Sequence, residues 1–543
     1  MAMKPIARGK VRTMTAATKI NTKVVMPPPV GGVDWLNPLS VMDPKNAQVL
    51  DNFIARPQGV ELRGGWQDVL DSPFEGSVNT LMSYPTPGNA LDKLFACVAN
   101  KVWDVTSALD PENPSGSGVE ALTVPVTHAY WSWVNYSLKT EKYLCAVAQG
   151  AGYFTYDQQD GWVERTITGV ENKEFRSITT WKQRLWFTQA NSSEVFYLGI
   201  GEVLGGEAKF FDYGPMLKRG GYVRAITSWT MDGGDGADDY QLIFGSEGDV
   251  LIYKGTDPEN PDTYALVGDW YLGKFPRGDR FFTPYGGDVL VLSDTGLTSM
   301  QLLVTGNASA VGMANPIVSK IQHRLSTRLS ETLDTGNWEV RLVPWLDVLL
   351  ITGPKNKSGQ YEHYCLGLTS KGWSTFSAMP INTGVMHDRV FYFATANGRV
   401  AHGLDVQGDG MLTNDLEYGS GTPVQGRVIS AYTDFGQSAN LKRFLLARPI
   451  FQCSRPPKIK VRMKIDYASG ARLASPGNDE AEIALWDYAI WDQAYWSGTG
   501  NVYHLLIGVL GVGYLGALEM VVTGEKGTIY TGAHLTAEVG GML

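Results

Sequence analysis

One stretch near residue 410 has the residue types and spacing of a calcium-binding loop. Asp405 and Asp409 stand where an EF-hand loop would begin, and Asp415 adds a carboxylate downstream. Such a loop is closed by a bidentate carboxylate at its twelfth position, but Leu416 occupies that position here. Asp405, Asp409 and Asp415 are therefore candidate calcium ligands, and a solvated turn is the favoured interpretation of the stretch.

The residue patterns of common catalytic sites are missing from the sequence. The seven histidines are scattered and none lies in an HExxH pattern, and neither GxSxG nor the phosphate-binding GxxxxGK[ST] occurs. The sialidase Asp box, Ser-x-Asp-x-Gly, is also absent, because the aspartate of SDTG at Ser293 stands one place early. The sequence therefore predicts a protein that is not an enzyme, with no cofactor and no resident metal.

Two groups of residues are candidates for contact with other molecules. Trp486, Trp491 and Trp496 recur within WDYAIWDQAYW, where they could stack on a sugar or a base. A packed corner of the C-terminal domain, including burial in an interface, is the favoured alternative for these tryptophans. The second group is basic and lies in the first 33 residues, with no acid beside it; its first four members are Lys4, Arg8, Lys10 and Arg12.

The basic group has two interpretations, which the sequence leaves open. It is either a solvated terminus or a cationic arm that docks onto an acidic neighbour or onto DNA phosphates. The net charge of the whole chain is −9, so the remainder is more acidic than the total indicates. That balance argues against a protein that grips nucleic acid with its whole surface.

A hairpin of two apolar runs around a tight turn recurs seven times and indicates the fold. The copies begin at Leu94, Tyr143, Leu185, Leu242, Asp288, Asp347 and Arg389. Their turns are spaced by about 50 residues, a period typical of propeller blades, and glycine and aromatic residues are abundant. The sequence predicts a mainly β protein with a β-propeller of about seven irregular blades, six or eight also being compatible.

The chain divides into four segments by composition. Residues 1–33 read as a basic extended arm, 34–70 as a segment that contributes a strand to the β edge, 71–423 as the propeller, and 424–543 as a β-sandwich or barrel. A helix is predicted over residues 316–330, where isoleucine and leucine recur every four positions.

The remaining features concern cysteines, apolar stretches and location. The four cysteines are far apart and do not require disulfides or zinc. The most apolar stretch, LLIGVLGVGYLGAL from Leu505, is too short for a spanning helix and is predicted to form buried strands. No apolar signal segment follows the basic N-terminus. We therefore expect a protein without stable membrane insertion, made in a cytoplasm.

Three stretches together resemble the tail-nozzle, or tail-hub, proteins of short-tailed bacteriophages. They are NPLSVMDPKNAQVLDNFIARPQGVELRGGW from Asn37, the region from Tyr253 to Met300 with its GTDP and GGDVLVLSDTG segments, and WDYAIWDQAYW from Trp486. The stretch ANSSEVFYLGIGEVLGGEAKFFDYG from Ala190 departs from the family pattern. The resemblance implies a homo-hexameric ring in the virion tail, below the portal–adaptor proteins. It also implies attached fibre or needle proteins, and genomic DNA passing through the lumen without specific binding.

The leading hypothesis is therefore a virion structural protein that forms a tail nozzle and a conduit for DNA ejection. The alternative is a glycan-binding or glycan-cleaving propeller of a phage receptor-binding tail protein, which would need paired carboxylates facing a pocket. A cellular interaction scaffold of the kelch or WD type is a third possibility, although the repeat is irregular and lacks the WD signature.

Overall fold

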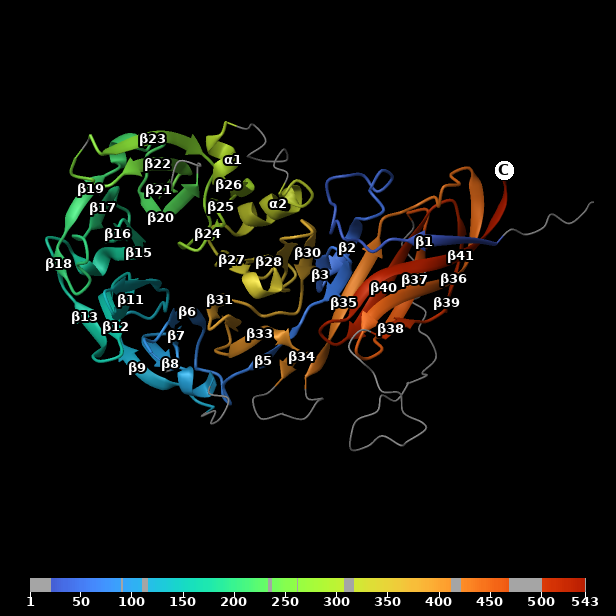
Figure 1. Cartoon of the computed structure of the whole chain (residues 1–543), viewed down its shortest axis with the longest axis horizontal. Helices are drawn as coiled ribbons and strands as arrows, with labels where there is room; N and C mark the ends of the chain where they lie inside the picture. The colour runs from blue at the N-terminus through green and yellow to red at the C-terminus, as the bar shows by residue number, and fades with distance from the viewer. Residues whose placement is uncertain are drawn as a thin grey trace, which may run out of the picture.

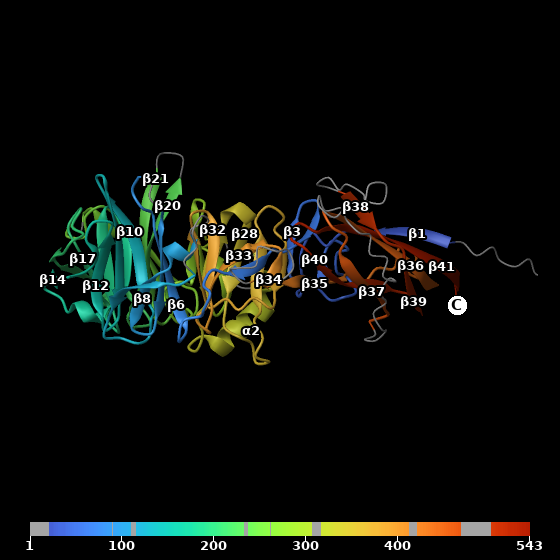
Figure 2. The same cartoon turned by 90° about the horizontal axis from the view of Figure 1, so that it is seen from below.

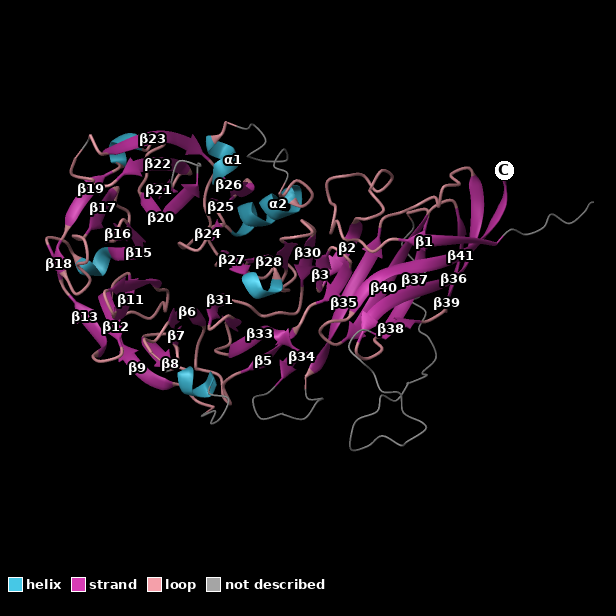
Figure 3. Cartoon of the chain, viewed as in Figure 1, coloured by secondary structure: helices cyan, strands magenta, loops and turns pink. Residues whose placement is uncertain are grey.

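The chain folds into a ring of small sheets beside an elongated two-sheet domain (Figure 1). The computed structural model describes residues 21–88, 91–109, 116–232, 237–260, 262–306, 317–411, 421–467 and 501–542. Strands make up nearly all the regular structure of these residues (Figure 3). The two parts lie side by side along the long axis of the molecule (Figure 2). The predicted mainly β propeller architecture is confirmed.

The first four blades are antiparallel sheets of four strands each. Blade 1 contains β6 (Val78–Tyr84), β7 (Lys93–Val98), β8 (Lys101–Asp104) and β9 (Val119–Thr123). Blade 2 contains β10 (Ser132–Leu138), β11 (Glu141–Ala148), β12 (Gly152–Asp157) and β13 (Gly161–Arg165). Blade 3 contains β15 (Phe175–Trp181), β16 (Arg184–Gln189), β17 (Glu194–Tyr197) and β19 (Lys209–Asp212). Blade 4 contains β20 (Val223–Asp232), β21 (Ala237–Gly245), β22 (Asp249–Gly255) and β23 (Tyr264–Tyr271).

The last three blades are less uniform. Blade 5 has three strands, β24 (Phe282–Tyr285), β25 (Asp288–Ser293) and β26 (Gly296–Ser299). Blade 6 contains β27 (Glu339–Val343), β28 (Val348–Thr352), β29 (His363–Gly367) and β30 (Trp373–Phe376). Blade 7 contains β31 (Thr383–His387), β32 (Val390–Ala394), β33 (Val400–Val406) and, as its outer strand, β5 (Gly65–Asp68).

The seven hairpins recognised in the sequence are the second and third strands of the seven blades. In the six blades that have four strands, these are the two central strands. They are β7–β8, β11–β12, β16–β17, β21–β22, β25–β26, β28–β29 and β32–β33. The second strand of a blade is covered on both faces by neighbouring blades, so a continuous apolar run suits it. In β25 and β28 every residue is buried, whereas the outer strand β9 is mostly exposed.

The propeller is closed by a strand that precedes blade 1 in the sequence. β5 runs antiparallel to β33, with Asp68 opposite Ala401 and Trp66 opposite Gly403. The same strand lies beside β34 (Gly408–Met411), which pairs with β35 (Thr422–Ser430) of the two-sheet domain. The closure therefore joins the start of the chain to the end of the repeat.

The two-sheet domain combines strands from both ends of the chain. Its N-terminal strands are β1 (Asn21–Met26), β2 (Ala47–Asp51), β3 (Phe53–Arg56) and β4 (Gly59–Leu62). Its later strands are β35, β36 (Asn440–Cys453), β37 (Lys458–Ile465), β38 (Asn501–His504), β39 (Ile507–Gly513), β40 (Gly516–Gly524) and β41 (Ile529–Met542). In one sheet, β41 pairs with β36 along one side and with β1 and then β4 along the other. The other sheet has the strand order β37–β40–β35–β2.

One hydrophobic core runs from the propeller into the two-sheet domain. It includes Leu290 and Leu349 of the blades as well as Phe444, Met520 and Leu535 of the two-sheet domain. Sheet pairing is also continuous there, because β2 contacts both β30 of blade 6 and β35. The two parts are therefore packed as one body, and are not connected by a bare linker.

Helices are few in the described part of the chain. α1 (Met300–Val304) and α2 (Gln322–Thr332) follow blade 5, and short 3-10 helices cover Thr106–Leu109, Asn172–Glu174, Gly214–Met216 and Pro344–Leu346. The predicted helix over 316–330 is displaced: residues 317–321 form turns, and the helix runs to Thr332 with Leu325 and Leu329 on its buried side. No helix in the described ranges is long and apolar enough to cross a membrane.

Two further short elements complete the described secondary structure. β14 (Ile167–Thr168) and β18 (Gly206–Glu207) form a parallel pair of two residues each beside blade 3. The pair joins the connection between blades 2 and 3 to the loop between β17 and β19, and it does not extend the sheet of blade 3.

Candidate functional site

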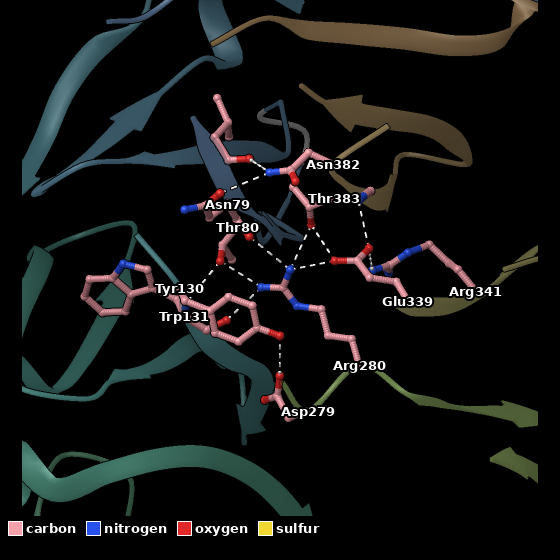
Figure 4. Close-up of polar contacts among 12 residues, drawn as sticks. Asn79, Thr80, Tyr130, Trp131, Asp279, Arg280, Glu339, Arg341, Asn382 and Thr383 are labelled. Atoms are coloured by element: carbon pink, nitrogen blue, oxygen red, sulfur yellow. Dashed lines mark hydrogen bonds and ion pairs between the residues drawn. The ribbon is translucent and has the colours of Figure 1, made fainter. Parts of the chain in front are cut away.

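The most concentrated polar cluster lies at the centre of the propeller, around Arg280. This residue comes just before β24, and its Nη1 donates to Glu339 Oε1 at 2.6 Å and to Thr383 Oγ1 at 2.8 Å (Figure 4). Its Nη2 donates to Thr80 Oγ1 at 2.7 Å and to the backbone oxygen of Trp131 at 3.0 Å. One guanidinium from blade 5 therefore connects blades 1, 2, 6 and 7.

Glu339, at the start of β27, is the anionic partner of this cluster and is almost fully buried. Its second oxygen, Oε2, accepts from the backbone nitrogen of Gly384 at 3.0 Å and from Arg341 Nη2 at 3.3 Å. Burial by itself would raise the pKa of the carboxyl group, but Arg280 and Arg341 outweigh burial and lower it. Glu339 is therefore held as a carboxylate.

A second layer of polar contacts surrounds the pair. The Tyr130 ring lies under the Arg280 guanidinium, 4.6 Å from its centroid, and the Tyr130 hydroxyl donates to Asp279 Oδ1 at 3.4 Å. Asn382 Nδ2 donates to the backbone oxygen of Val78 at 2.7 Å, which adds a direct contact between blades 7 and 1. We call Arg280, Glu339, Thr80, Thr383 and Tyr130 the axial cluster.

The axial cluster is suited to a structural role, in which it holds neighbouring blades together. Retaining and inverting glycosidases both need one carboxyl group that carries a proton at working pH, which requires a raised pKa. Glu339 has the opposite shift, and both of its oxygens already accept hydrogen bonds. It can neutralise buried cations and orient neighbouring blades, but it is poorly suited to give a proton to a substrate.

Of the candidate calcium ligands, Asp405 lies on β33 and Asp409 on β34, beside β5 and the turn between β40 and β41. Asp409 forms a bidentate ion pair with Arg63, in which both Nη–Oδ distances are 2.8 Å, and the Arg63 side chain is fully buried. Asp405 forms an ion pair with Lys526 and lies 3.8 Å from His402 Nε2. Asp415 lies outside the described residues. Two of the three carboxylates are thus engaged by cationic side chains of the protein.

Within the described ranges, no group of three or more His, Cys, Asp and Glu residues is arranged to hold a metal ion. The four cysteines are free and buried, and burial raises the pKa of Cys145 and of Cys365 to about 12. At neutral pH these two thiols are therefore protonated and behave as small core residues.

The other candidate contact residues belong to the basic N-terminal segment and to the WDYAIWDQAYW stretch. Lys4, Arg8, Lys10 and Arg12 lie outside the described residues, as do Trp486, Trp491 and Trp496. Part of the predicted basic arm is described, however: residues 21–26 form β1 and pair with β41 from Asn21 opposite Glu538 to Met26 opposite Ala533.

An exposed apolar strip lies at the edge of the two-sheet domain, on β38, β39 and the residues beside them. Leu510 is 76% exposed, Val502 66%, Leu506 59% and Val512 57%. The prediction that LLIGVLGVGYLGAL forms buried strands is wrong for its first half. β40 is buried, but β39 alternates, with Ile507 and Val509 facing the core and Leu510 and Val512 facing outward. We call Val502, Leu506, Leu510 and Val512 the apolar strip.

The sequence did not identify Arg280, Glu339 or Arg63 as residues of a polar site. The available signal was a charged residue directly beside an apolar or aromatic one, as in Arg280-Phe281 and Trp338-Glu339. A charged residue beside an apolar one can lie at the start of a buried strand. A charge in that position needs an oppositely charged or hydrogen-bonding partner. The partner itself cannot be identified from this signal.

A solved structure aligns with part of this chain at low sequence identity. No family model and no curated protein matches the chain. Among solved structures, a quinonprotein alcohol dehydrogenase-like protein from Bacteroides thetaiotaomicron aligns with 11% identity and a TM-score of 0.33. The alignment covers 55% of this chain and 66% of that one, so this chain spans slightly less than two thirds of the other protein.

Proposed function

We propose that this chain is a structural subunit of the tail nozzle of a short-tailed bacteriophage. Copies of it would form a ring, six in number by the resemblance, below the portal–adaptor proteins. Fibre or needle proteins would attach to the ring, and DNA would leave through it. The choice of family rests on the resemblance of three sequence stretches. The proposed self-assembly is supported by the exposed apolar strip on the two-sheet domain.

The apolar strip is the observation that carries the assembly proposal. Four large aliphatic side chains on one sheet edge are between 57% and 76% exposed. β39 pairs with β36 on one side and has no strand partner on its other side among the described strands. A strand edge with free backbone groups and apolar side chains favours pairing with another chain. The strip lies on the two-sheet domain, beyond the blades (Figure 1).

The axial cluster bears on the route of the DNA. Arg280 fills the middle of the propeller with hydrogen bonds to four other blades, so the propeller axis is occupied by side chains. A conduit formed by this protein would therefore run between subunits. With a net charge of −9, a ring of such chains would repel DNA phosphates more than it binds them.

Electron microscopy of the purified chain under negative stain, combined with light scattering after size-exclusion chromatography, tests this proposal. We expect a ring with a central opening, and we expect Leu510→Asp with Val512→Asp to give monomers with an unchanged circular dichroism spectrum. Val119→Asp is the matched control, because Val119 is 62% exposed on the outer strand of blade 1.

Monomers of the unmodified chain at every concentration would contradict the assembly proposal. Rings that persist in the Leu510 and Val512 double variant would show that the strip is not the contact surface. The alternative of a glycan-binding or glycan-cleaving propeller remains a prediction from the sequence, and the lowered pKa of Glu339 argues against that residue as its acid.

A further inference from the structure

A cavity of about 650 Å³ lies between α2, the long hairpin that joins β28 to β29, and Trp35. This is within the size range of pockets that hold small ligands, roughly 300–1,000 Å³. Six of its lining residues matter for the argument: Trp35, Arg324, Arg328, Glu331, Lys355 and Lys357. We call it the α2 cavity. It is separate from the axial cluster and from the apolar strip.

The walls of the α2 cavity are held in place by Arg328. This side chain is buried, and its two terminal nitrogens donate to the backbone oxygens of Pro354 and Glu362, at either end of the hairpin. Its guanidinium also lies 5.3 Å from the centroid of the Trp338 ring. Because helix and hairpin are tied together by one residue, the cavity is formed without a ligand.

Arg328 also leaves a donor unused. Its Nε is buried, and among the described residues it has no hydrogen-bond partner. A buried N–H without a partner costs free energy comparable to a lost hydrogen bond, and a charged group costs more.

The charge of the cavity wall is positive, in contrast to the chain as a whole. Arg324, Arg328, Lys355 and Lys357 line it together with one carboxylate, Glu331, which lies 2.6 Å from Lys357. Arg324 is paired at 2.8 Å with Glu362. Lys355 has no carboxylate within ion-pair distance among the described residues, and its Nζ lies 5.0 Å from the Tyr361 ring centroid.

Trp35 adds an apolar, flat wall to this cationic site. Its indole nitrogen donates to the backbone oxygen of Gln48 at 3.1 Å, which fixes the ring, and the Arg324 guanidinium lies 4.4 Å from the ring centroid. Asn356 and Ser358 supply an amide and a hydroxyl on the opposite hairpin. A cation, an aromatic face and neutral polar groups together suit a polar ring that carries a negative charge.

We propose that the α2 cavity binds a sugar ring that carries a carboxylate or a phosphate. Lys355 and Arg324 would pair with the anionic group, and the Trp35 ring would contact the body of the sugar. Acidic sugars of a surface glycan and sugar phosphates of a nucleotide share this chemistry. The inference goes beyond the proposed ring and does not depend on it, since every residue it uses belongs to one chain.

Isothermal titration calorimetry of the full chain tests this inference. The probes are glucuronate, N-acetylneuraminic acid, ribose 5-phosphate and, as the neutral control, glucose. We expect saturable binding of at least one acidic sugar, weakened at least about tenfold in Lys355→Gln with Arg324→Gln and reduced by raised salt. Tighter binding of the carboxylates would indicate a glycan as the source, and tighter binding of the phosphate a nucleotide.

The control variant is Lys274→Gln, which removes an exposed, paired lysine elsewhere on the propeller and is expected to bind normally. Arg324 and Lys274 side chains are 51% and 55% exposed, so neither change is expected to unfold the protein. Equal affinity for glucose, no saturable binding of any acidic probe, or unchanged binding in the Lys355 and Arg324 double variant would each overturn the proposal.

Discussion

At the propeller axis, Arg280 and Glu339 form an ion pair whose members come from blades 5 and 6. A buried pair of this kind adds little to stability over a well-packed apolar pair, but losing one member leaves an uncompensated charge. Here the arginine also donates to Thr80, Thr383 and the backbone of Trp131. The pair therefore sets the relative positions of blades that are distant in sequence.

Replacing Arg280 by methionine is expected to destabilise the protein by about 3–5 kcal/mol, because Glu339 and several acceptors lose their main partner. Chemical denaturation followed by tryptophan fluorescence measures the change. Adding Glu339→Gln should recover part of the loss, since the buried negative charge is then removed. Lys101→Ala, which breaks an exposed pair with Glu120, is the control and should cost no more than about 1 kcal/mol. A loss of that small size in the Arg280 variant would contradict the assigned role.

His363 provides a pH-dependent contribution at the residue scale. It is fully buried in β29, where its Nε2 lies 3.0 Å from the backbone oxygen of Met379, and burial lowers its pKa to about 4. The unfolded chain binds the proton more readily than the folded chain between pH 4 and the ordinary histidine pKa of about 6.5. Its contribution is therefore complete above pH 6.5 and is lost as the pH falls toward 4.

We expect this loss to amount to about 3 kcal/mol across that range. Denaturation midpoints measured from pH 4 to pH 7 should fall less steeply with acidification in His363→Gln than in the unmodified chain. The exposed His534 is the control, and His534→Gln should keep the original slope. An identical slope in the His363 variant would rule out this group as the source of acid sensitivity.

Among the elements, β5 has the most demanding position, because it enters the last blade from the other end of the chain. Gly65 has no room for a side chain: a Cβ there would lie 1.9 Å from the backbone oxygen of Gly408. The backbones of β5 and β34 approach so closely that only glycine fits. Closure of the propeller thus depends on a position whose neighbour is far away in the sequence.

Gly65→Ala is therefore expected to separate β5 from β34 and to weaken closure of blade 7. The expected result is a lower thermal midpoint and faster limited proteolysis, with a cost of about 1–3 kcal/mol, as for other overpacked sites. Gly287→Ala is the matched control, since nothing lies within 4 Å of a Cβ built at Gly287. Equal behaviour of the two variants would show that β5 can shift without disturbing closure.

Over the whole molecule, the propeller and the two-sheet domain share a core and a run of paired strands. Leu349 of blade 6, Leu50 of β2 and Val428 of β35 belong to the same buried cluster. β1 to β4, from the start of the chain, complete the domain formed by its end. Neither part has a complete set of strands without the segment that precedes blade 1.

We therefore expect differential scanning calorimetry to show one unfolding transition, with the two parts losing structure together. A fragment that begins at residue 63 keeps β5 but lacks β1 to β4, and it should lose the two-sheet domain while the blades become less stable. Two well-separated transitions in the full chain would show that the shared core does not couple the parts.

The blades could be predicted from the sequence because the second strand of a blade is buried on both faces. A long apolar run around a tight turn is visible without knowledge of any partner, and all seven runs became hairpins. Outer strands such as β9 and β23 are largely exposed and carry no such signal, so they could not be located in the same way.

The polar sites could not be predicted, because their partners are distant. Arg280 meets Glu339 from 59 residues away and Asn79 from 201 residues away. Asp409 looked like a metal ligand in its local sequence, yet its partner Arg63 is 346 residues distant. Spacing rules apply to residues on one element, whereas these contacts arise where separate blades converge.

The sequence by itself determined the β class, the repeated hairpins and the acidic character of the chain, since these follow from local patterns of burial and from composition. Only the tertiary structure decided how the ring closes, which carboxylates are neutralised and which apolar strand faces outward. The physical reason is that burial of a strand face or a charge depends on what the rest of the chain places against it. Leu510 and Ile507 have similar side chains on one strand, and only the fold shows that one is exposed and the other is core.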